Sequence, residues 1–328
     1  MIRHSWIPLN EQSTWKDALK GIPHAFGHTW ESCHAMSLST GYDTYLYTFE
    51  ADGVRIVCPI AERSFHGYID ILTPYGFSGF TGIGSCLDFP KHWKQEAARR
   101  NYVCGYILLN PILHNPDYHA QEDAYAYNCI YAIDLQLEVE ELFARLSKNR
   151  KRQLRSTDKS ITVIFDDKRL RSFILRHYSD FYRSKGASAV YQFLPKTIEE
   201  LVARDNVILL GTEGKNGIEE VMMLAFTPFE GQYLMSISNH DACRHTVTLL
   251  WKAIHLLKDR GVKWFNLGGG IRPGDGVAQF KERFGGQVLP LQSLKQIYNT
   301  ELYDKLCKQT HKDPEDLKGY FPPYHAGK

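Results

Sequence analysis

The chain lacks long apolar runs. No stretch of its 328 residues approaches the roughly 18 to 20 consecutive apolar residues that a membrane-spanning helix needs. The N-terminal residues Met1–Trp6 also lack the hydrophobic core of a signal peptide. These absences lead us to expect a cytoplasmic protein without a transmembrane segment.

A large excess of charge of either sign is also missing. Lysine and arginine total 39 residues, against 37 for aspartate and glutamate, and the formal net charge is +2 at pH 7. This balance offers no global electrostatic case for a protein that binds DNA or a membrane surface. The positive charge is nevertheless concentrated locally, because Lys148–Arg155 contains five cations in eight residues.

Paired cysteines and the motifs of covalent catalysis are absent as well. The seven cysteines are scattered, with no Cys-x-x-Cys pair, which indicates reduced thiols and argues against a zinc site. Neither a Gly-x-Ser-x-Gly elbow nor a Cys–His arrangement is legible. His24 and His28 have a spacing that could seat a metal on a helix, but Pro23 and Gly27 indicate a loop, and no third ligand is evident. We therefore expect no metal, and favour a loop that contacts substrate.

The length and composition are those of a globular protein with two domains. A chain of 328 residues suits two domains of about 150 residues, each able to bury a core. The hydrophobic fraction is 43% and the charged fraction 23%, both ordinary values. Aromatic residues reach 13%, with 19 tyrosines. This abundance suits either a cleft for amphipathic ligands or a core rich in tyrosine.

The first half reads as helices followed by strands. Period-two alternation over 44–50 predicts a strand, and the Asp52-Gly53 turn returns the chain as a hairpin partner over 54–60. Further elements are expected as helices over 15–19, 29–38 and 92–100, and as strands over 102–109 and 126–135.

The second half repeats a similar order more clearly. After a helix over 137–154 that carries the basic run, the pattern predicts strand, helix, helix, three antiparallel strands, helix and strand. The expected ranges are 159–165, 170–184, 197–203, 207–213, 221–229, 231–238, 246–260 and 264–267. Two similar α/β units in tandem, covering residues 1–145 and 146–328, are the economical interpretation, with a ligand cleft between or beside them.

The segment after the last predicted strand carries the best candidate for chemistry. Gly268, Gly269 and Gly270 allow the backbone to approach a ligand closely, although a mobile turn has the same composition. Phe280 and Phe284 lie four residues apart, so that one helical face buries both rings and holds Lys281 on the adjoining edge. A cation fixed in this way can meet a phosphate or a developing oxyanion. The alternative is a solvated surface lysine.

These segments resemble a known family. The string 264–270, a short loop and Phe280-Lys281-x-x-Phe284-Gly285 are similar to the C-terminal signature of the Fem peptidyltransferases and of related GNAT-type acyltransferases. Other segments agree, namely 147–155, 182–186, 249–254 with Gly261, and 73–79. The resemblance covers the second half well and the first half loosely. It implies an α/β (α+β) fold, a tandem pair of GNAT-like domains with mixed, mostly antiparallel sheets flanked by helices.

The resemblance also implies which residues form the site. Lys281 would hold the acceptor's phosphate or the reacting carbonyl, and Tyr233 would act beside it in the acceptor cleft. The remaining substrate-binding candidates are Phe280, Tyr191, Arg183, Tyr75, Gly269 and Gly270. No general base can be named, although Asp275 and Tyr233 are candidates.

The donor is less clear than the site. Family members transfer amino acids from aminoacyl-tRNA, while others use acyl-CoA. The glycine-rich pyrophosphate loop of acetyltransferases is replaced by Arg244–Leu249, where Thr246 could still cap a helix and bind an anion. Arg150 and Arg152 of the basic run would contact tRNA, unless the run is only a solvated helix face.

We therefore expect a transferase that moves an aminoacyl or acyl group to an amine of a small molecule or a cell-envelope precursor, such as one of peptidoglycan biosynthesis. Aminoacyl-tRNA is favoured narrowly over acyl-CoA as the co-substrate, and no permanently bound cofactor is expected. The partners would be the acceptor and tRNA. An alternative of another class is a ligand-binding module that kept the fold without turnover.

Overall fold

The computed structural model describes residues 2–156, 162–165, 168–188, 191–238 and 245–326. The chain divides into two compact units. Unit 1 contains residues 1–127 and 290–328, and unit 2 contains residues 128–289. Within the described residues, no helix has the length and apolar character needed to cross a membrane.

The limits of these units differ from the expected division into residues 1–145 and 146–328. Ile133, Leu135 and Leu142 come before the expected boundary, yet they pack in the core of unit 2. At the other end, the segment from Pro290 onward belongs to unit 1, where its apolar side chains are buried. Unit 1 is completed by a C-terminal segment that is distant in sequence, so that one cut in the chain cannot separate the units.

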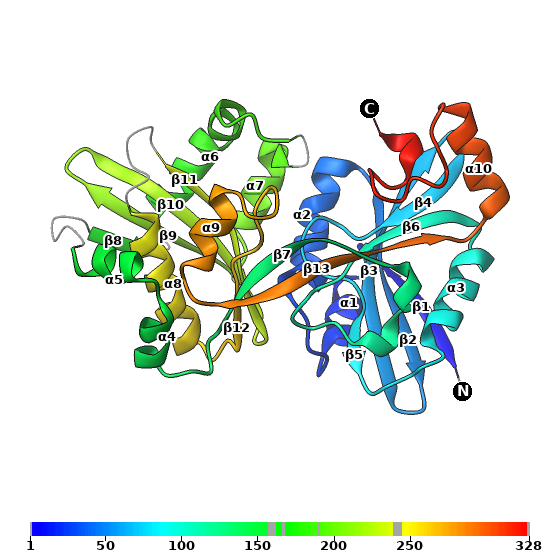
Figure 1. The fold of residues 1–328 in the computed structure, drawn as a ribbon, viewed down its shortest axis with the longest axis horizontal. Coiled ribbons are helices and arrows are strands. Elements are labelled where there is room, and N and C mark those ends of the chain that lie inside the picture. Colours follow the sequence, from blue (N-terminus) through cyan, green and yellow to red (C-terminus); the bar gives the residue numbers. More distant parts are fainter. Residues whose placement is uncertain (1, 157–161, 166–167, 189–190, 239–244, 327–328) are drawn as a thin grey trace. The chain divides into compact units, whose positions relative to one another are not determined.

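Unit 1 is built on a mixed, mostly antiparallel sheet with the strand order β1-β2-β3-β4-β6-β13, and β5 pairs with β3 at the side (Figure 1). Only the β4–β6 pair is parallel among these strands. The expected hairpin is confirmed, since Ala51 pairs with Val54 across the Asp52-Gly53 turn. The strands are β1 (Arg3–Pro8), β2 (Asp43–Ala51), β3 (Val54–Phe65), β4 (Tyr68–Leu72), β5 (Thr81–Ile83), β6 (Tyr102–Leu108) and β13 (Gln287–Ile297).

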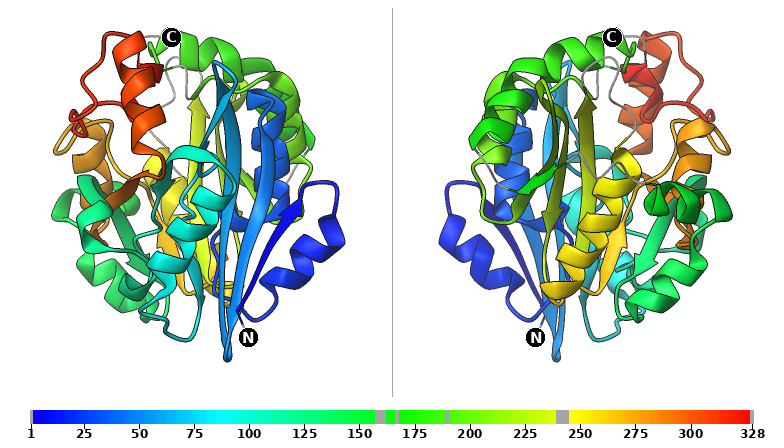
Figure 2. Two further views of the ribbon diagram at one scale, coloured as in Figure 1. Left: turned by 90° about the vertical axis from the view of Figure 1, so that its right-hand side faces the viewer. Right: turned by 90° about the vertical axis from the view of Figure 1, so that its left-hand side faces the viewer.

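Helices cover this sheet and bury aromatic side chains against it. Figure 2 (left) shows α3 lying over the strands, where Phe89 and Trp93 pack with Tyr47 and Phe49. The α-helices of unit 1 are α1 (Gln12–Leu19), α2 (Trp30–Thr40), α3 (Phe89–Arg99) and α10 (Thr300–Gln309). Short 3-10 helices are η1 (Phe26–His28), η2 (Pro116–Tyr118), η3 (Gln121–Asp123) and η5 (Pro323–His325). The high tyrosine content therefore contributes to a core, as one of the two interpretations expects.

The strands of unit 2 pair in the order β7-β12-β11-β10-β9-β8, and their directions are mixed. Only the β11–β12 pair is parallel among them. The strands are β7 (Ala124–Asp134), β8 (Thr162–Phe165), β9 (Val207–Gly214), β10 (Gly217–Phe226), β11 (Glu230–Ser238) and β12 (Trp264–Asn266). The helices are α4 (Val139–Arg145), α5 (Lys148–Arg155), α6 (Lys168–Ser184), α7 (Pro195–Val202), α8 (Thr246–Asp259) and α9 (Gly276–Glu282).

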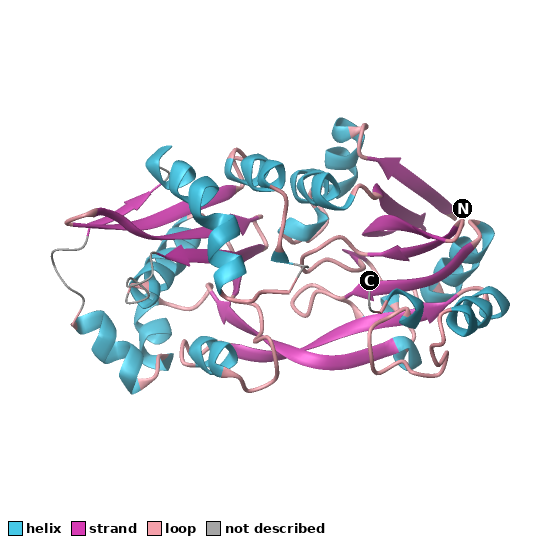
Figure 3. Ribbon diagram, turned by 90° about the horizontal axis from the view of Figure 1, so that it is seen from above, coloured by secondary structure: helices cyan, strands magenta, loops and turns pink. Residues whose placement is uncertain are grey.

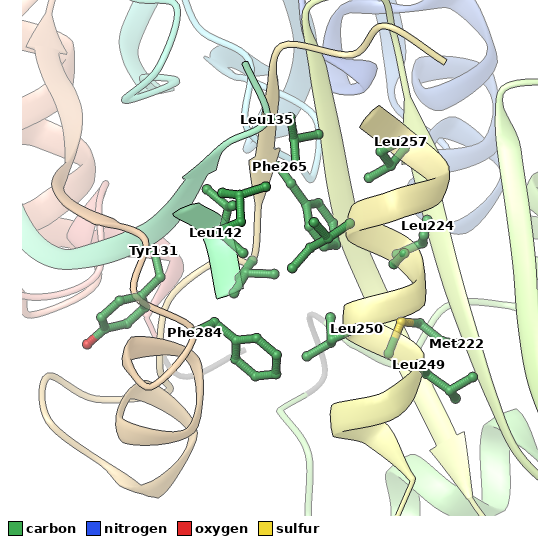
Figure 4. Packing of buried hydrophobic residues seen from close by; sticks show 14 of the residues in the cluster. Tyr131, Leu135, Leu142, Met222, Leu224, Leu249, Leu250, Leu257, Phe265 and Phe284 are labelled. Carbon is green, nitrogen blue, oxygen red and sulfur yellow. The ribbon is translucent and has the colours of Figure 1, made fainter. Parts of the chain in front are cut away.

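Helices lie on both faces of the unit 2 strands (Figure 3). On one face, Leu170 of α6 lies against Gly211 of β9. On the other, Leu249 and Leu250 of α8 pack on Met222 and on neighbouring apolar side chains of the sheet. Figure 4 shows this second layer and the side chains of β12 and α4 that complete it. The alternation of side chains along each strand supplies both layers.

The expected helix over 137–154 is wrong in one respect, because two helices replace it. Leu146 and Ser147 are extended, with ψ of 142° and 153°, and they separate α4 from α5. The Ser147 hydroxyl accepts a hydrogen bond from Arg150 N, and Ser147 N donates to Arg283 O at 3.0 Å. Ser147 is thus the N-cap of α5, and the break ties the basic helix to the segment after α9.

Candidate active site

In unit 2, β11 pairs with β12 over only the first part of its length. Gln232 of β11 pairs with Asn266, the last residue of β12, and in the described part of the chain β11 then continues to Ser238 with β10 alone. Asn266 directs the chain away at this point. Its side chain donates to the Glu230 carboxylate at 3.0 Å and accepts from Gly268 N at 2.8 Å. The glycine segment therefore leaves the sheet where β11 becomes an unpaired edge on that side.

Gly269 and Gly270 are required by contacts within the chain. A Cβ on Gly269 would lie 2.4 Å from Cys129 O, and one on Gly270 would lie 2.4 Å from Asp275 Oδ1. Asn128 strengthens the same contact by donating to Gly270 O at 2.9 Å. The two glycines were expected to bring the backbone near a ligand. The structure shows another reason for these glycines. The space that a Cβ would take is filled by the backbone of Cys129 at Gly269 and by the Asp275 carboxylate at Gly270.

Asp275 closes the loop and starts α9. Its Oδ1 accepts from Ala278 N at 2.8 Å, and its Oδ2 accepts from Ile271 N and Arg272 N at 2.8 and 2.9 Å. These N–H bonds to Ala278 and Arg272 lower the pKa of Asp275. Both oxygens are engaged as an N-cap, so that Asp275 is poorly suited to the base role considered from the sequence.

Lys281 is buried at the end of α9, with 9% of its surface exposed. Its Nζ donates to Gly269 O at 2.6 Å and lies 5.7 Å from the centre of the Tyr233 ring on β11. Burial lowers the pKa of Lys281 from 10.5 to about 8, although the charge of Asp275 partly opposes this change. A solvated surface lysine, the alternative considered above, does not match this environment.

Arg150 holds the two phenylalanines that flank Lys281. Its guanidinium lies 4.3 Å from the Phe280 ring centre and 5.3 Å from that of Phe284, and it donates to Phe280 O at 3.2 Å. Only 4% of Arg150 is exposed. It was expected to bind the donor, but this clamp engages it inside the protein. Arg152 is exposed on α5, where it donates to Asn149 Oδ1 at 3.0 Å.

Tyr233 belongs to a polar group at the start of α8. Its pKa is raised by burial and by the charge of Glu220, and the nearby Ser236 side chain opposes this change. Ser236 and Thr246 both donate to Glu220 Oε1 at 2.6 Å. Burial raises the pKa of Glu220 in turn. The hydroxyl of Thr246, expected to bind a donor anion, already donates to this carboxylate.

Other expected residues lie elsewhere or in different surroundings. Arg183 is exposed on α6, with its guanidinium 3.1 Å from Asp180. Tyr191 is 36% exposed, and its carbonyl accepts from the Tyr178 hydroxyl. Tyr75 is 38% exposed and belongs to unit 1. Arg244 lies outside the described residues.

The early histidines have structural partners. His28 is fully buried, Nδ1 accepts from Ala25 N at 3.1 Å, and Nε2 lies 3.1 Å from Gly79 O. Burial lowers its pKa to about 3. The expectation of substrate contact is therefore not supported at His28. Across the described ranges, no three His, Cys, Asp or Glu side chains gather as a metal site would require.

Glu220 is the residue that sequence reasoning missed. It shares a face of β10 with Met222 and Leu224, both fully buried. An acid in the inward-facing series of an apolar strand is a signal that could have identified it, because burying a carboxylate without a purpose costs stability.

Comparison with protein-family models and with curated proteins finds no match. Solved structures do match. FemX superposes with a TM-score of 0.69 at 11% identity, over 92% of this chain and 99% of FemX. The chain has the fold of FemX.

Two other structures agree. L-PGS from Bacillus licheniformis has a TM-score of 0.57 at 12% identity, over 90% of this chain and 94% of that one. A conserved protein of unknown function from Bacteroides thetaiotaomicron has a TM-score of 0.61 at 9% identity, over 90% and 100%. At these identities the likeness concerns the fold. The expected α/β (α+β) class, with mixed, mostly antiparallel sheet structure flanked by helices, is confirmed.

Proposed function

We propose that the chain is a transferase in which an amine attacks an activated acyl or aminoacyl group beside Lys281. The observation that carries this proposal is the buried Lys281 ammonium, anchored on Gly269 O at 2.6 Å and facing Tyr233 at the open edge of β11. A tetrahedral oxyanion forms when an amine adds to an ester or thioester. A fixed cation in a poorly hydrated site stabilises that charge without reorganising.

The surroundings of α8 favour an aminoacyl-tRNA donor over acyl-CoA. Acyl-CoA carries a pyrophosphate, and helix N-termini bind such anions through backbone N–H groups. Here Glu220 lies at the start of α8, where its carboxylate accepts from the Thr246 hydroxyl. A second, more highly charged anion in the same position would be repelled.

The basic helix α5 supports the same donor. With Arg150 in the interior, the exposed cations of α5 are Lys148, Arg152 and Arg155. Their spacing of four and then three residues puts them on one helical face. Arg150, which lies between them in the sequence, is buried and does not belong to this face. Three phosphate contacts on such a face give salt-dependent affinity for tRNA.

The test is transfer of label to amines. Purified protein is incubated with tRNA charged with radiolabelled amino acids, or with labelled acyl-CoA thioesters, and with an amine-containing extract of cell-envelope precursors. Lys281→Ala should lose at least about a hundredfold in turnover, because it removes the oxyanion's charged partner. Lys252→Ala, which changes an exposed lysine of α8, is the matched control and should retain activity.

Two results would contradict parts of the proposal. Near-normal turnover by Lys281→Ala would exclude the proposed role of that lysine. Transfer from acyl-CoA, together with a rise of several degrees in melting temperature with CoA, would reverse the choice of donor. The acceptor is proposed only as a small-molecule or precursor amine, in a cytoplasmic setting.

A further inference from the structure

The proposed reaction needs a group that takes a proton. An amine that has attacked a carbonyl must lose a proton before the tetrahedral intermediate collapses to an amide. Asp275 has both oxygens in backbone hydrogen bonds. Lys281 is mainly protonated at neutral pH, since its pKa is about 8. Neither of these two groups is suited to take the proton, which directs attention to the other ionisable groups around Tyr233.

An irregularity in β11 brings the polar side chains together. Tyr233 pairs with Leu224 and Met235 pairs with Met223, so that Leu234 is an extra residue in β11. Residues 233 and 236 of a regular strand would point to opposite faces. The extra residue restores both to one face, opposite Leu224 and Met222, which are followed on that face of β10 by Glu220.

The hydroxyl groups around Glu220 donate their hydrogen bonds toward its carboxylate. The Ser236 hydroxyl donates to Glu220 Oε1 at 2.6 Å, and so does the Thr246 hydroxyl. The Ser236 side chain also acts on Tyr233, whose pKa it lowers. Because the Ser236 proton is given to Glu220, a neutral Tyr233 can bond to the Ser236 oxygen only as the donor. Each donor points toward the carboxylate.

Glu220 has the capacity to receive a proton. It is 1% exposed, and in the described part of the chain its Oε2 has no hydrogen-bond partner. Burial raises its pKa, while Ser236 of β11, Thr246 of α8 and His245, the N-cap of α8, oppose that change. Tyr182 of α6 and the Lys281 ammonium also face Tyr233, and Glu219 lies 3.3 Å from His245 Nε2. A carboxylate with an unsatisfied buried oxygen gains most from protonation.

We propose that Tyr233, Ser236 and Glu220 form a proton relay for the transfer reaction, in which Glu220 is the final acceptor. This inference rests on the function proposed above. As the C–N bond forms, the amine proton passes to the Tyr233 oxygen, the phenolic proton to Ser236 Oγ, and the serine proton to Glu220 Oε1. The bond to the leaving oxygen then breaks, and that oxygen takes a proton from the Lys281 ammonium. Exchange with solvent afterwards removes the proton from Glu220 and restores that of Lys281.

The kinetic test compares two acceptors. Both amines must lose a proton after they attack the carbonyl. The N–H of the hydroxylamine adduct is much more acidic than that of the methylamine adduct and can pass to water, so that only methylamine depends on a base of the protein. With labelled aminoacyl-tRNA as the donor, Glu220→Gln should lower kcat for methylamine by about a hundredfold, the size of a general-base contribution. KM should change little, and hydroxylamine should recover most of the rate. The ascending limb of the pH profile should also disappear.

Ser236 provides matched controls on the same strand. Ser236→Ala interrupts the relay and should behave like Glu220→Gln, while Ser236→Thr keeps the hydroxyl and should restore the rate. Ser238→Ala removes a neighbouring hydroxyl on the same face of β11 and should leave the rate unchanged. Equal rates for Ser236→Ala and Ser238→Ala would overturn the relay, as would a normal pH profile in Glu220→Gln.

A second measurement does not depend on turnover. Infrared difference spectra between wild-type and Glu220→Gln protein should reveal a protonated carboxyl band that persists above the ordinary titration range of glutamate. Tyr233 should ionise at lower pH in Glu220→Gln, because the nearby negative charge is gone. A wild-type protein that transfers nothing from either donor would refute the proposed function and the relay's catalytic role. Absence of both spectroscopic changes would refute the relay alone.

Discussion

Replacement of Lys281 by methionine should reveal what its burial costs. The pKa of Lys281 falls from 10.5 to about 8 because burial disfavours the ammonium. A difference of this size corresponds to about 3 kcal/mol between the two protonation states. Lys281→Met keeps an unbranched chain of similar length without the charge. It also removes the hydrogen bond to Gly269 O, which contributes about 1 kcal/mol when the amine is neutral.

The sign of the effect follows from proton binding. Between pH 8 and 10.5 the unfolded wild-type chain binds more protons at this lysine than the folded one, so that its stability rises with pH in that window. The methionine variant lacks this dependence. At pH 7 it should be more stable than wild type by about 2 kcal/mol, and near pH 10.5 it should be less stable by about 1 kcal/mol.

The assay is the difference in melting temperature between the two proteins across this pH range. Other titrating groups are shared, and their contributions cancel in the difference. For a unit of about 150 residues, a change of about 3 kcal/mol corresponds to roughly 6 to 12 °C. A difference that stays constant within about 2 °C would refute the reasoning, because it would mean that Lys281 is hydrated in the folded state.

Three further outcomes follow from the same unit. Activity should fall above pH 8 as Lys281 loses its proton, and Lys281→Arg should remove that descending limb from the pH–rate profile, since arginine stays charged. Arg150→Met should destabilise the protein by about 1 to 2 kcal/mol in thermal unfolding, because it removes a buried cation–π clamp, whereas Arg152→Met, at an exposed position, should change stability by less than about 0.5 kcal/mol. Gly269→Ala should lower the melting temperature and misplace Lys281, because the new Cβ would lie 2.4 Å from Cys129 O; a variant with normal stability and activity would show that the loop can yield.

The parts of the site that could be predicted are close together in sequence. Gly268–Gly270 and Phe280–Gly285 fall within 18 residues, and helical spacing alone relates Phe280 to Phe284. Local chemistry therefore identified Lys281 as a held cation. It could not identify the contacts of Arg150, whose partner Phe280 is 130 residues away.

The directions of side chains were harder to predict where the two-residue alternation of a strand is interrupted. The extra residue in β11 reverses the faces of Tyr233 and Ser236 relative to an unbroken strand. Propensity also favoured one helix over 137–154, since strong helix formers surround Ser147. Ser147 instead caps α5 and donates a hydrogen bond to Arg283 O, and these contacts outweigh the helix propensity. Both features depend on tertiary contacts, and a periodic pattern does not register them.

Several elements of unit 1 could not be predicted from the sequence, for a different reason. β1, β4 and β13 were not predicted, and neither was α10. β4 has five residues, a length at which periodicity is ambiguous. β13 is longer, but it contributes to unit 1 by pairing with β6, whose residues lie far earlier in the chain. Pairing between distant segments also explains why the limits of the compact units could not be found from composition.

Two buried ionisable groups of unit 2, Lys281 and Glu220, stabilise the fold less than neutral residues of their size would. The Lys281 ammonium donates to Gly269 O, and Glu220 keeps an oxygen without a partner in the described structure. Methionine and glutamine would fill the same volumes without the cost of desolvating a charge. A structural role would not retain both charges, whereas an oxyanion and a departing proton need one group of each sign. Both groups act on Tyr233, which is where the reacting amine is proposed to bind.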